Sequence, residues 1–119
     1  MKKSLRIIAL AMVALMLMLT LASCGAPKSN PDKALKALEK NDYIAQKSEE
    51  GDDDVECMVA GRSKDGTDYV TIIYYKTSAA AKEGFEDAKE AFEGQDDIIV
   101  KRSGKMVYAG TKEGIKAAS

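Results

Sequence analysis

The segments VECMVAGR (residues 55–62) and YVTIIYYK (residues 69–76) decide the fold of this 119-residue chain. Both are rich in valine, isoleucine and tyrosine, the residue types that β-strands favour. The linker Ser63-Lys64-Asp65-Gly66-Thr67 contains an Asp-Gly pair, which accommodates the positive backbone angles of a tight hairpin turn. The two segments are therefore predicted to form an antiparallel hairpin.

The second segment presents apolar residues on both of its faces. Side chains alternate along a strand, so one face carries Val70, Ile72 and Tyr74, and the other carries Tyr69, Thr71, Ile73 and Tyr75. This composition is typical of a central strand, or of a strand whose open face meets a partner.

A possible partner face follows from the same alternation. Tyr69, Tyr75, Thr71 and Met58 are expected to share the sheet face that helices leave uncovered, where they would form an amphipathic platform suited to an interface. The alternative is that these tyrosines simply complete a small hydrophobic core.

Three helices are predicted from capping residues and apolar spacing. Asn30-Pro31-Asp32 predicts the start of the first, which ends near Asn41 in a left-handed residue. Thr77-Ser78 caps the second, which runs to about Glu93 with Gly94 as its stop. Thr111 caps a short terminal helix over residues 112–118.

Three further strands complete the predicted order. They are expected at Tyr43–Ser48, Ile98–Arg102 and Lys105–Gly110, the last two forming a second hairpin. The expected fold class is α+β: a small two-layer sandwich in which an antiparallel sheet of about five strands carries two main helices and a short C-terminal helix on one face. Residues 31–119 form a single domain, since the chain is too short for a second core.

The N-terminus has the layout of an export signal. Lys2, Lys3 and Arg6 precede an apolar run that reaches Ala22, and the stretch Leu21-Ala22-Ser23-Cys24 leads directly into a polar segment. This stretch resembles the lipobox of bacterial lipoproteins. The resemblance implies that the Cys24 sulfur carries a diacylglyceryl group and that a signal peptidase removes residues 1–23.

The anchored protein is expected to face the extracytoplasmic side of the cell membrane, or of the outer membrane in a Gram-negative host. An uncleaved transmembrane segment is the alternative interpretation, because the uncharged run is close to the length that a bilayer requires. Residues 24–30 are expected to form the lipidated cysteine and a short tether. Without residues 1–23 the chain keeps 15 Lys and Arg against 19 Asp and Glu, a formal charge of −4, which does not favour nucleic-acid binding.

Motifs for chemistry are few. The sequence contains no histidine, and therefore no Ser-His-Asp or Cys-His arrangement. The acidic run Glu49–Glu56 lacks the alternating spacing of an EF-hand, so a solvated loop is expected and no metal or other cofactor is predicted. Cys57, in register with Val55 and Val59, is expected to be a buried core residue rather than an exposed thiol.

These patterns favour a binding or scaffolding module over an enzyme. A basic tip at Lys101, Arg102 and Lys105 is a possible attractor for an anionic partner, although such tips are usually just soluble turns. The alternatives are a small carboxylate-dependent cell-envelope enzyme and an accessory subunit of a transport or envelope complex.

Overall fold

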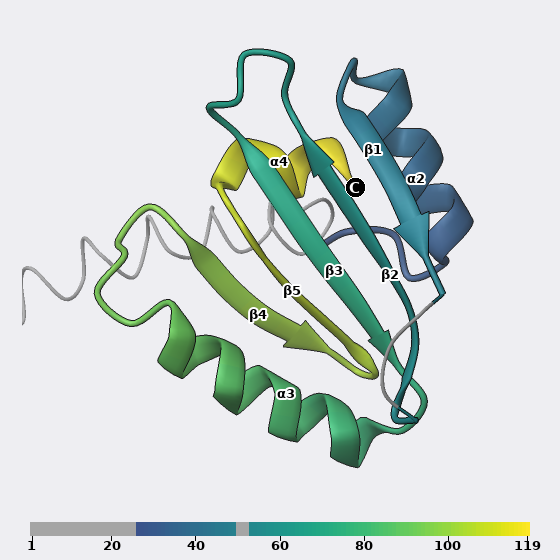
Figure 1. Ribbon diagram of the computed structural model, residues 1–119, viewed down its shortest axis with the longest axis vertical. Coiled ribbons are helices and arrows are strands. Elements are labelled where there is room, and N and C mark those ends of the chain that lie inside the picture. The colour runs from purple at the N-terminus through teal and green to yellow at the C-terminus, as the bar shows by residue number, and fades with distance from the viewer. Residues whose placement is uncertain (1–25, 50–52) are drawn as a thin grey trace, which may run out of the picture.

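Five antiparallel strands form one sheet, in the order β1-β2-β3-β5-β4, in the computed structural model, which describes residues 26–49 and 53–119 (Figure 1). In chain order the elements are α2 (Pro31–Lys40), β1 (Ile44–Ser48), β2 (Val55–Arg62), β3 (Tyr69–Tyr75), α3 (Ser78–Ala91), β4 (Ile99–Ser103), β5 (Met106–Gly110) and α4 (Lys112–Ala117). The predicted α+β class, its five-stranded antiparallel sheet and its three helices are thus confirmed.

The central hairpin has the predicted register. Arg62 pairs with Tyr69 and Ala60 pairs with Thr71, and Gly66 in the connecting turn has a φ of 78°. Val70, Ile72 and Tyr74 are buried on one face of β3, as the alternation predicts.

Helices α2 and α4 cover that face. Leu38 of α2 packs against β2 so closely that a Cβ on Gly61 would lie 2.9 Å from the Leu38 Cδ1 atom. Leu38 and Ile115 of α4 belong to one buried cluster with Val59 and Ile72. This cluster is the main hydrophobic core.

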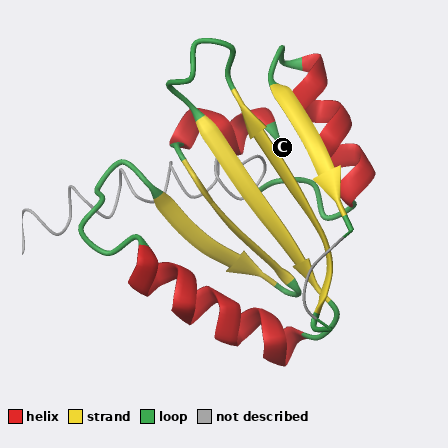
Figure 2. Cartoon of the chain, in the orientation of Figure 1, coloured by secondary structure: helices red, strands yellow, loops and turns green. Residues whose placement is uncertain are grey.

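Helix α3 lies on the opposite face of the sheet, which differs from the predicted two-layer arrangement with all helices on one face. A Cβ on Gly84 would overlap the Tyr75 hydroxyl, and Tyr75 alternates with Tyr74 on β3. Val107 and Ala109, which pair with Ile73 and Thr71, are buried on this second face although they lie outside the main core cluster. Figure 2 shows α4 behind the strands, with α3 beside β4 and α2 beside β1.

The loop after α2 differs from its prediction by one residue. Asp42, not Asn41, adopts the left-handed conformation, with a φ of 66°. Asn41 instead donates from its Nδ2 to the carbonyl oxygens of Ala37 and Ala117, at 2.9 and 3.1 Å. The amide therefore joins the end of α2 to the end of α4.

Residues 27 and 28, expected in the tether, lie against the domain instead. Pro27 is buried. The Lys28 N–H donates to the Ala118 carbonyl at 3.0 Å, and its carbonyl accepts from the Tyr74 hydroxyl at 2.9 Å. Residues 1–23 and Cys24 lie outside the described residues. None of the helices within residues 26–49 and 53–119 has the length and apolar character needed to cross a membrane.

Helix α4 is fixed to β3 through contacts with the Tyr69 backbone. The Thr111 N–H donates to the Tyr69 carbonyl at 2.9 Å, and the Tyr69 N–H donates to the Thr111 Oγ1 at 3.1 Å. A Cβ on Gly114 would overlap the Tyr69 backbone. The absence of a side chain at residue 114 is therefore what lets the helix approach the strand.

Gly114→Ala should lower the free energy of unfolding by about 1–3 kcal/mol, because the added methyl group forces α4 away from β3. Helix propensity alone predicts the opposite sign, a gain of about 1 kcal/mol. Urea denaturation followed by circular dichroism measures the difference. Lys116→Ala, at an exposed position of the same helix, is the control and should change stability by less than about 0.5 kcal/mol. A Gly114→Ala variant as stable as the wild type would contradict the close approach.

Candidate functional site

The sheet face that carries α3 is only half covered. Helix α3 packs over β4, β5 and the end of β3 where Tyr75 lies, whereas no helix of residues 26–49 and 53–119 lies above β1, β2 and the start of β3. We call this uncovered area the open face and define it by Ile44, Gln46, Ala60, Arg62, Tyr69 and Thr71.

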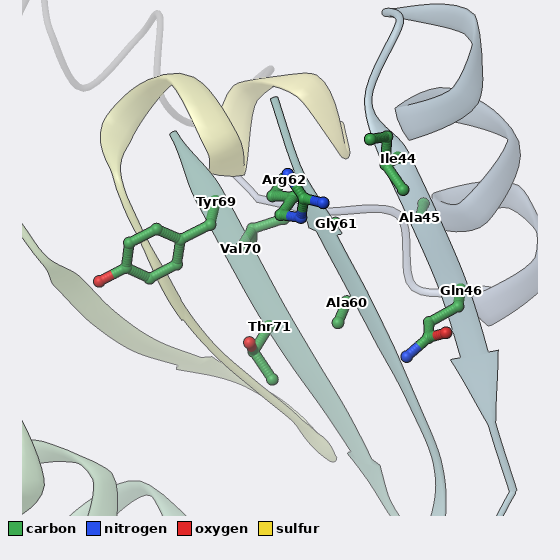
Figure 3. A pocket seen from close by; sticks show the side chains of 9 residues that line it. All are labelled: Ile44, Ala45, Gln46, Ala60, Gly61, Arg62, Tyr69, Val70 and Thr71. Atoms are coloured by element: carbon green, nitrogen blue, oxygen red, sulfur yellow. The ribbon is translucent and has the colours of Figure 1, made fainter. Parts of the chain in front are cut away.

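The open face forms a shallow hollow of about 430 Å³. Its side chains come from three neighbouring strands, and Arg62 lies between Tyr69 and Ile44 at one end of it (Figure 3). Strand register explains this grouping, because Ile44, Arg62 and Tyr69 are successive partners across β1, β2 and β3. Ile44 and Tyr69 are the large hydrophobic residues that remain exposed among the described residues, at 51% and 36% of their surface.

Arg62 has no ionic partner in the described part of the chain. The ion pairs found there join Lys47 to Asp32 and Glu49, and Lys89 to Glu86. Ala60 and Ile44 line the same hollow as Arg62, which is exposed. The open face therefore combines an unpaired cation, an aromatic ring and apolar surface, and tyrosine and arginine are enriched in protein interfaces.

The structure places all four residues of the predicted partner face on this side of the sheet. Tyr69 and Thr71 lie on the open face itself, and Met58 continues it along β2, where it pairs with Ile73. Tyr75 is separate, because it packs beneath α3 at Gly84. The predicted face is thus divided between an open part and a covered part.

Sequence reasoning missed Ile44, Gln46 and Arg62. The signal for Arg62 was present, since the Asp-Gly hairpin places it directly opposite Tyr69. Ile44 and Gln46 required the pairing of β1 with β2, which the acidic loop between these strands leaves undetermined. Their contribution becomes visible only in the assembled sheet.

Cys57 and the acidic run Glu49–Glu56, the candidates for reactive or metal-binding groups in the sequence, do not belong to the open face. Cys57 is 3% exposed within the main core, which confirms the buried position, and burial raises the pKa of its thiol. Residues 26–49 and 53–119 contain no group of three or more side chains suited to a metal ion and no buried charged side chain. Part of the acidic run Glu49–Glu56 lies outside these ranges.

The basic tip lies in the second hairpin, away from the open face. Lys101, Arg102 and Lys105 are exposed, and Arg102 Nη1 donates to the carbonyl of Gly104 at 3.0 Å across the turn. That hydrogen bond gives the arginine a structural role within its own turn.

Comparisons with known proteins add no relative. No protein-family model matches the chain, and neither the curated proteins nor the solved structures gave a match.

The hairpin that presents Arg62 and Tyr69 is held by the Asp65 carboxylate. This carboxylate accepts hydrogen bonds from the Ser63 hydroxyl at 2.7 Å, the Thr67 hydroxyl at 2.8 Å and the Thr67 N–H at 3.1 Å. These hydrogen bonds, that of Ser63 first, lower the pKa of Asp65 from 3.8 to about 2. The charged form is the one that organises the turn.

The stability of the hairpin should accordingly depend on acid pH. Between the unfolded-state pKa of 3.8 and the folded-state pKa of about 2, the unfolded chain binds more protons, so stability falls as the pH is lowered through this window. Asp65→Asn should show a smaller loss of unfolding free energy between about pH 4 and pH 2 in urea titrations. Asp96→Asn, the same chemical change in an exposed turn, controls for the loss of one negative charge. An unchanged acid slope in Asp65→Asn would refute this role.

Proposed function

We propose that this protein is a membrane-anchored extracytoplasmic lipoprotein whose domain acts as a binding or scaffolding module through the open face. The single observation that carries the binding role is the half-covered sheet, where Arg62 lies beside Tyr69 without an ionic partner among the described residues. The anchor rests on the resemblance of Leu21-Ala22-Ser23-Cys24 to a lipobox.

The open face suits a partner more than it suits a buried small molecule. Its hollow is broad and shallow, and its residues come from the flat surface of three strands. Small-molecule sites enclose most of the ligand surface, whereas protein interfaces are flatter and carry aromatic and arginine residues at their centre. A protein or another cell-envelope component is therefore the proposed partner.

The chemistry of the open face defines what the partner presents. The Arg62 guanidinium offers planar donors that match a carboxylate or a phosphate. Tyr69 adds an aromatic surface with a polar tip, and Ile44 and Ala60 add apolar area. The matching partner presents an anionic group next to apolar or aromatic surface.

In cells that carry the full chain, a photoreactive amino acid at Thr71 should give a discrete crosslinked product. Combining it with Arg62→Ala and Tyr69→Ala should reduce the yield about tenfold or more, since residues of this kind at the centre of an interface contribute about 2 kcal/mol each. A photoreactive residue at Lys82, exposed on α3, is the matched control and should not give that product. Equal products from both positions would contradict the binding role.

The anchor has its own test. Cys24→Ala should abolish metabolic labelling with a fatty acid and release the protein from the membrane fraction. A Cys24→Ala variant that stays processed and membrane-bound would show that the lipobox resemblance is misleading, independently of the crosslinking result.

A further inference from the structure

The chain enters the domain at Pro27 and Lys28, which are held in place by the folded domain; we call these two residues the fixed point. Pro27 is buried, and both backbone polar groups of Lys28 are hydrogen-bonded, to Ala118 and to the Tyr74 hydroxyl. Consecutive Cα atoms are about 3.8 Å apart, so Cys24 lies at most about 11 Å from Pro27. If Cys24 carries a lipid, the domain is held directly against the bilayer.

The fixed point lies on the side of α2 and α4. Tyr74 and Ala118 both belong to the main core, which those helices cover, and Tyr74 points to the opposite side of β3 from Thr71 on the open face. The described chain therefore enters the domain on the side of the sheet opposite the open face.

The two sides of the sheet also differ in charge: the side of α2 and α4 is basic, and the side of α3 is acidic. The helix layer that includes the fixed point carries a surplus of exposed lysines, which are Lys28, Lys33, Lys36, Lys40, Lys112 and Lys116. Its exposed carboxylates are fewer, namely Asp32, Glu39 and Glu113 on the helices and Asp42 in the turn after α2, and Asp32 is paired with Lys47 at 3.0 Å. This layer is net positive although the chain as a whole is net negative.

The α3 side has the opposite charge. Exposed carboxylates exceed exposed lysines along this helix and the turn that follows it; the carboxylates are Glu83, Glu86, Asp87, Glu90, Glu93, Asp96 and Asp97, and the lysines are Lys82 and Lys89. An anionic membrane surface attracts basic residues within about 10 Å and repels acidic ones. The two sides therefore differ in their preference for a bilayer.

From the fixed entry point and this charge division, we infer that the outer surface of α2 and α4 lies on the anionic lipid headgroups and that the open face is directed away from the membrane. The inference rests on the proposed lipid anchor. It identifies a second interaction surface, with the bilayer as its partner, and it leaves the open face accessible from the extracytoplasmic side.

Fluorescence quenching in vesicles tests this orientation. The lipidated full chain, carrying Glu39→Cys on the outer side of α2 or Gln46→Cys on the open face, is labelled with a fluorophore; Cys57 is buried and the unsubstituted protein controls for its labelling. In phosphatidylcholine vesicles with phosphatidylglycerol as the minor component, a headgroup-attached quencher should quench the label at residue 39 several-fold more than the label at residue 46. Equal quenching, or stronger quenching at residue 46, would overturn the orientation.

A charge variant tests the role of the lysines. Replacing Lys33, Lys36 and Lys112 together by glutamine should reduce the quenching contrast, whereas Lys82→Gln with Lys89→Gln on α3 should preserve it. A full contrast in the triple variant would overturn the role of lipid charge. Failure of the lipid anchor itself is distinguishable, because metabolic labelling of the wild-type protein with a fatty acid would then be absent.

Discussion

Strand β3 is apolar on both faces, and the rest of the architecture follows from covering it. The face of Val70, Ile72 and Tyr74 is closed by two helices, α2 and α4. Among the elements that the structure describes, α3 alone packs on the other face. A helix is about 10 Å wide and strands lie about 4.8 Å apart, so one helix covers about two strands of a sheet. In a five-stranded sheet, α3 therefore leaves β1, β2 and the start of β3 uncovered by the described helices. The open face is thus a geometric consequence of having one helix on the second face, and its residues suit it to contact with another molecule.

The boundaries of the elements could be predicted from the sequence because local chemistry marks them. Asn30, Thr77 and Thr111 cap the three helices as predicted, and Gly66, Gly94 and Gly104 adopt the positive φ values that their turns require. The side of the sheet on which α3 packs could not be predicted, because the spacing of its apolar residues shows which face of the helix is buried but not which face of the sheet receives it. The bridging role of Asn41 and the attachment of Lys28 to Ala118 depend on contacts between the two ends of the chain, which no local pattern reports.

The candidate site could be predicted in part, where local sequence patterns determine which residues share a face. Alternation along β3 was enough to place Tyr69 and Thr71 together, and Arg62 followed from the hairpin register. Ile44 and Gln46 joined them only through the pairing of β1. The net charge of the chain did not predict how charge is distributed over its surface. The chain is net negative, yet the α2 and α4 layer is basic and the α3 side is acidic. Together these features give the domain two unlike sides, one that suits lipid headgroups and one that suits a partner molecule.

If the proposed function is right, the open face is free in the isolated domain and occupied on the cell. Hydroxyl-radical footprinting compares the two states directly, because Tyr69 and Met58 both react with the radical and both lie on the uncovered side of the sheet. The account predicts that both residues are oxidised in the purified domain and protected in the anchored protein on intact cells, while oxidation of Phe92 at the end of α3 is the same in both. Equal oxidation of Tyr69 and Met58 in the two states would contradict the account.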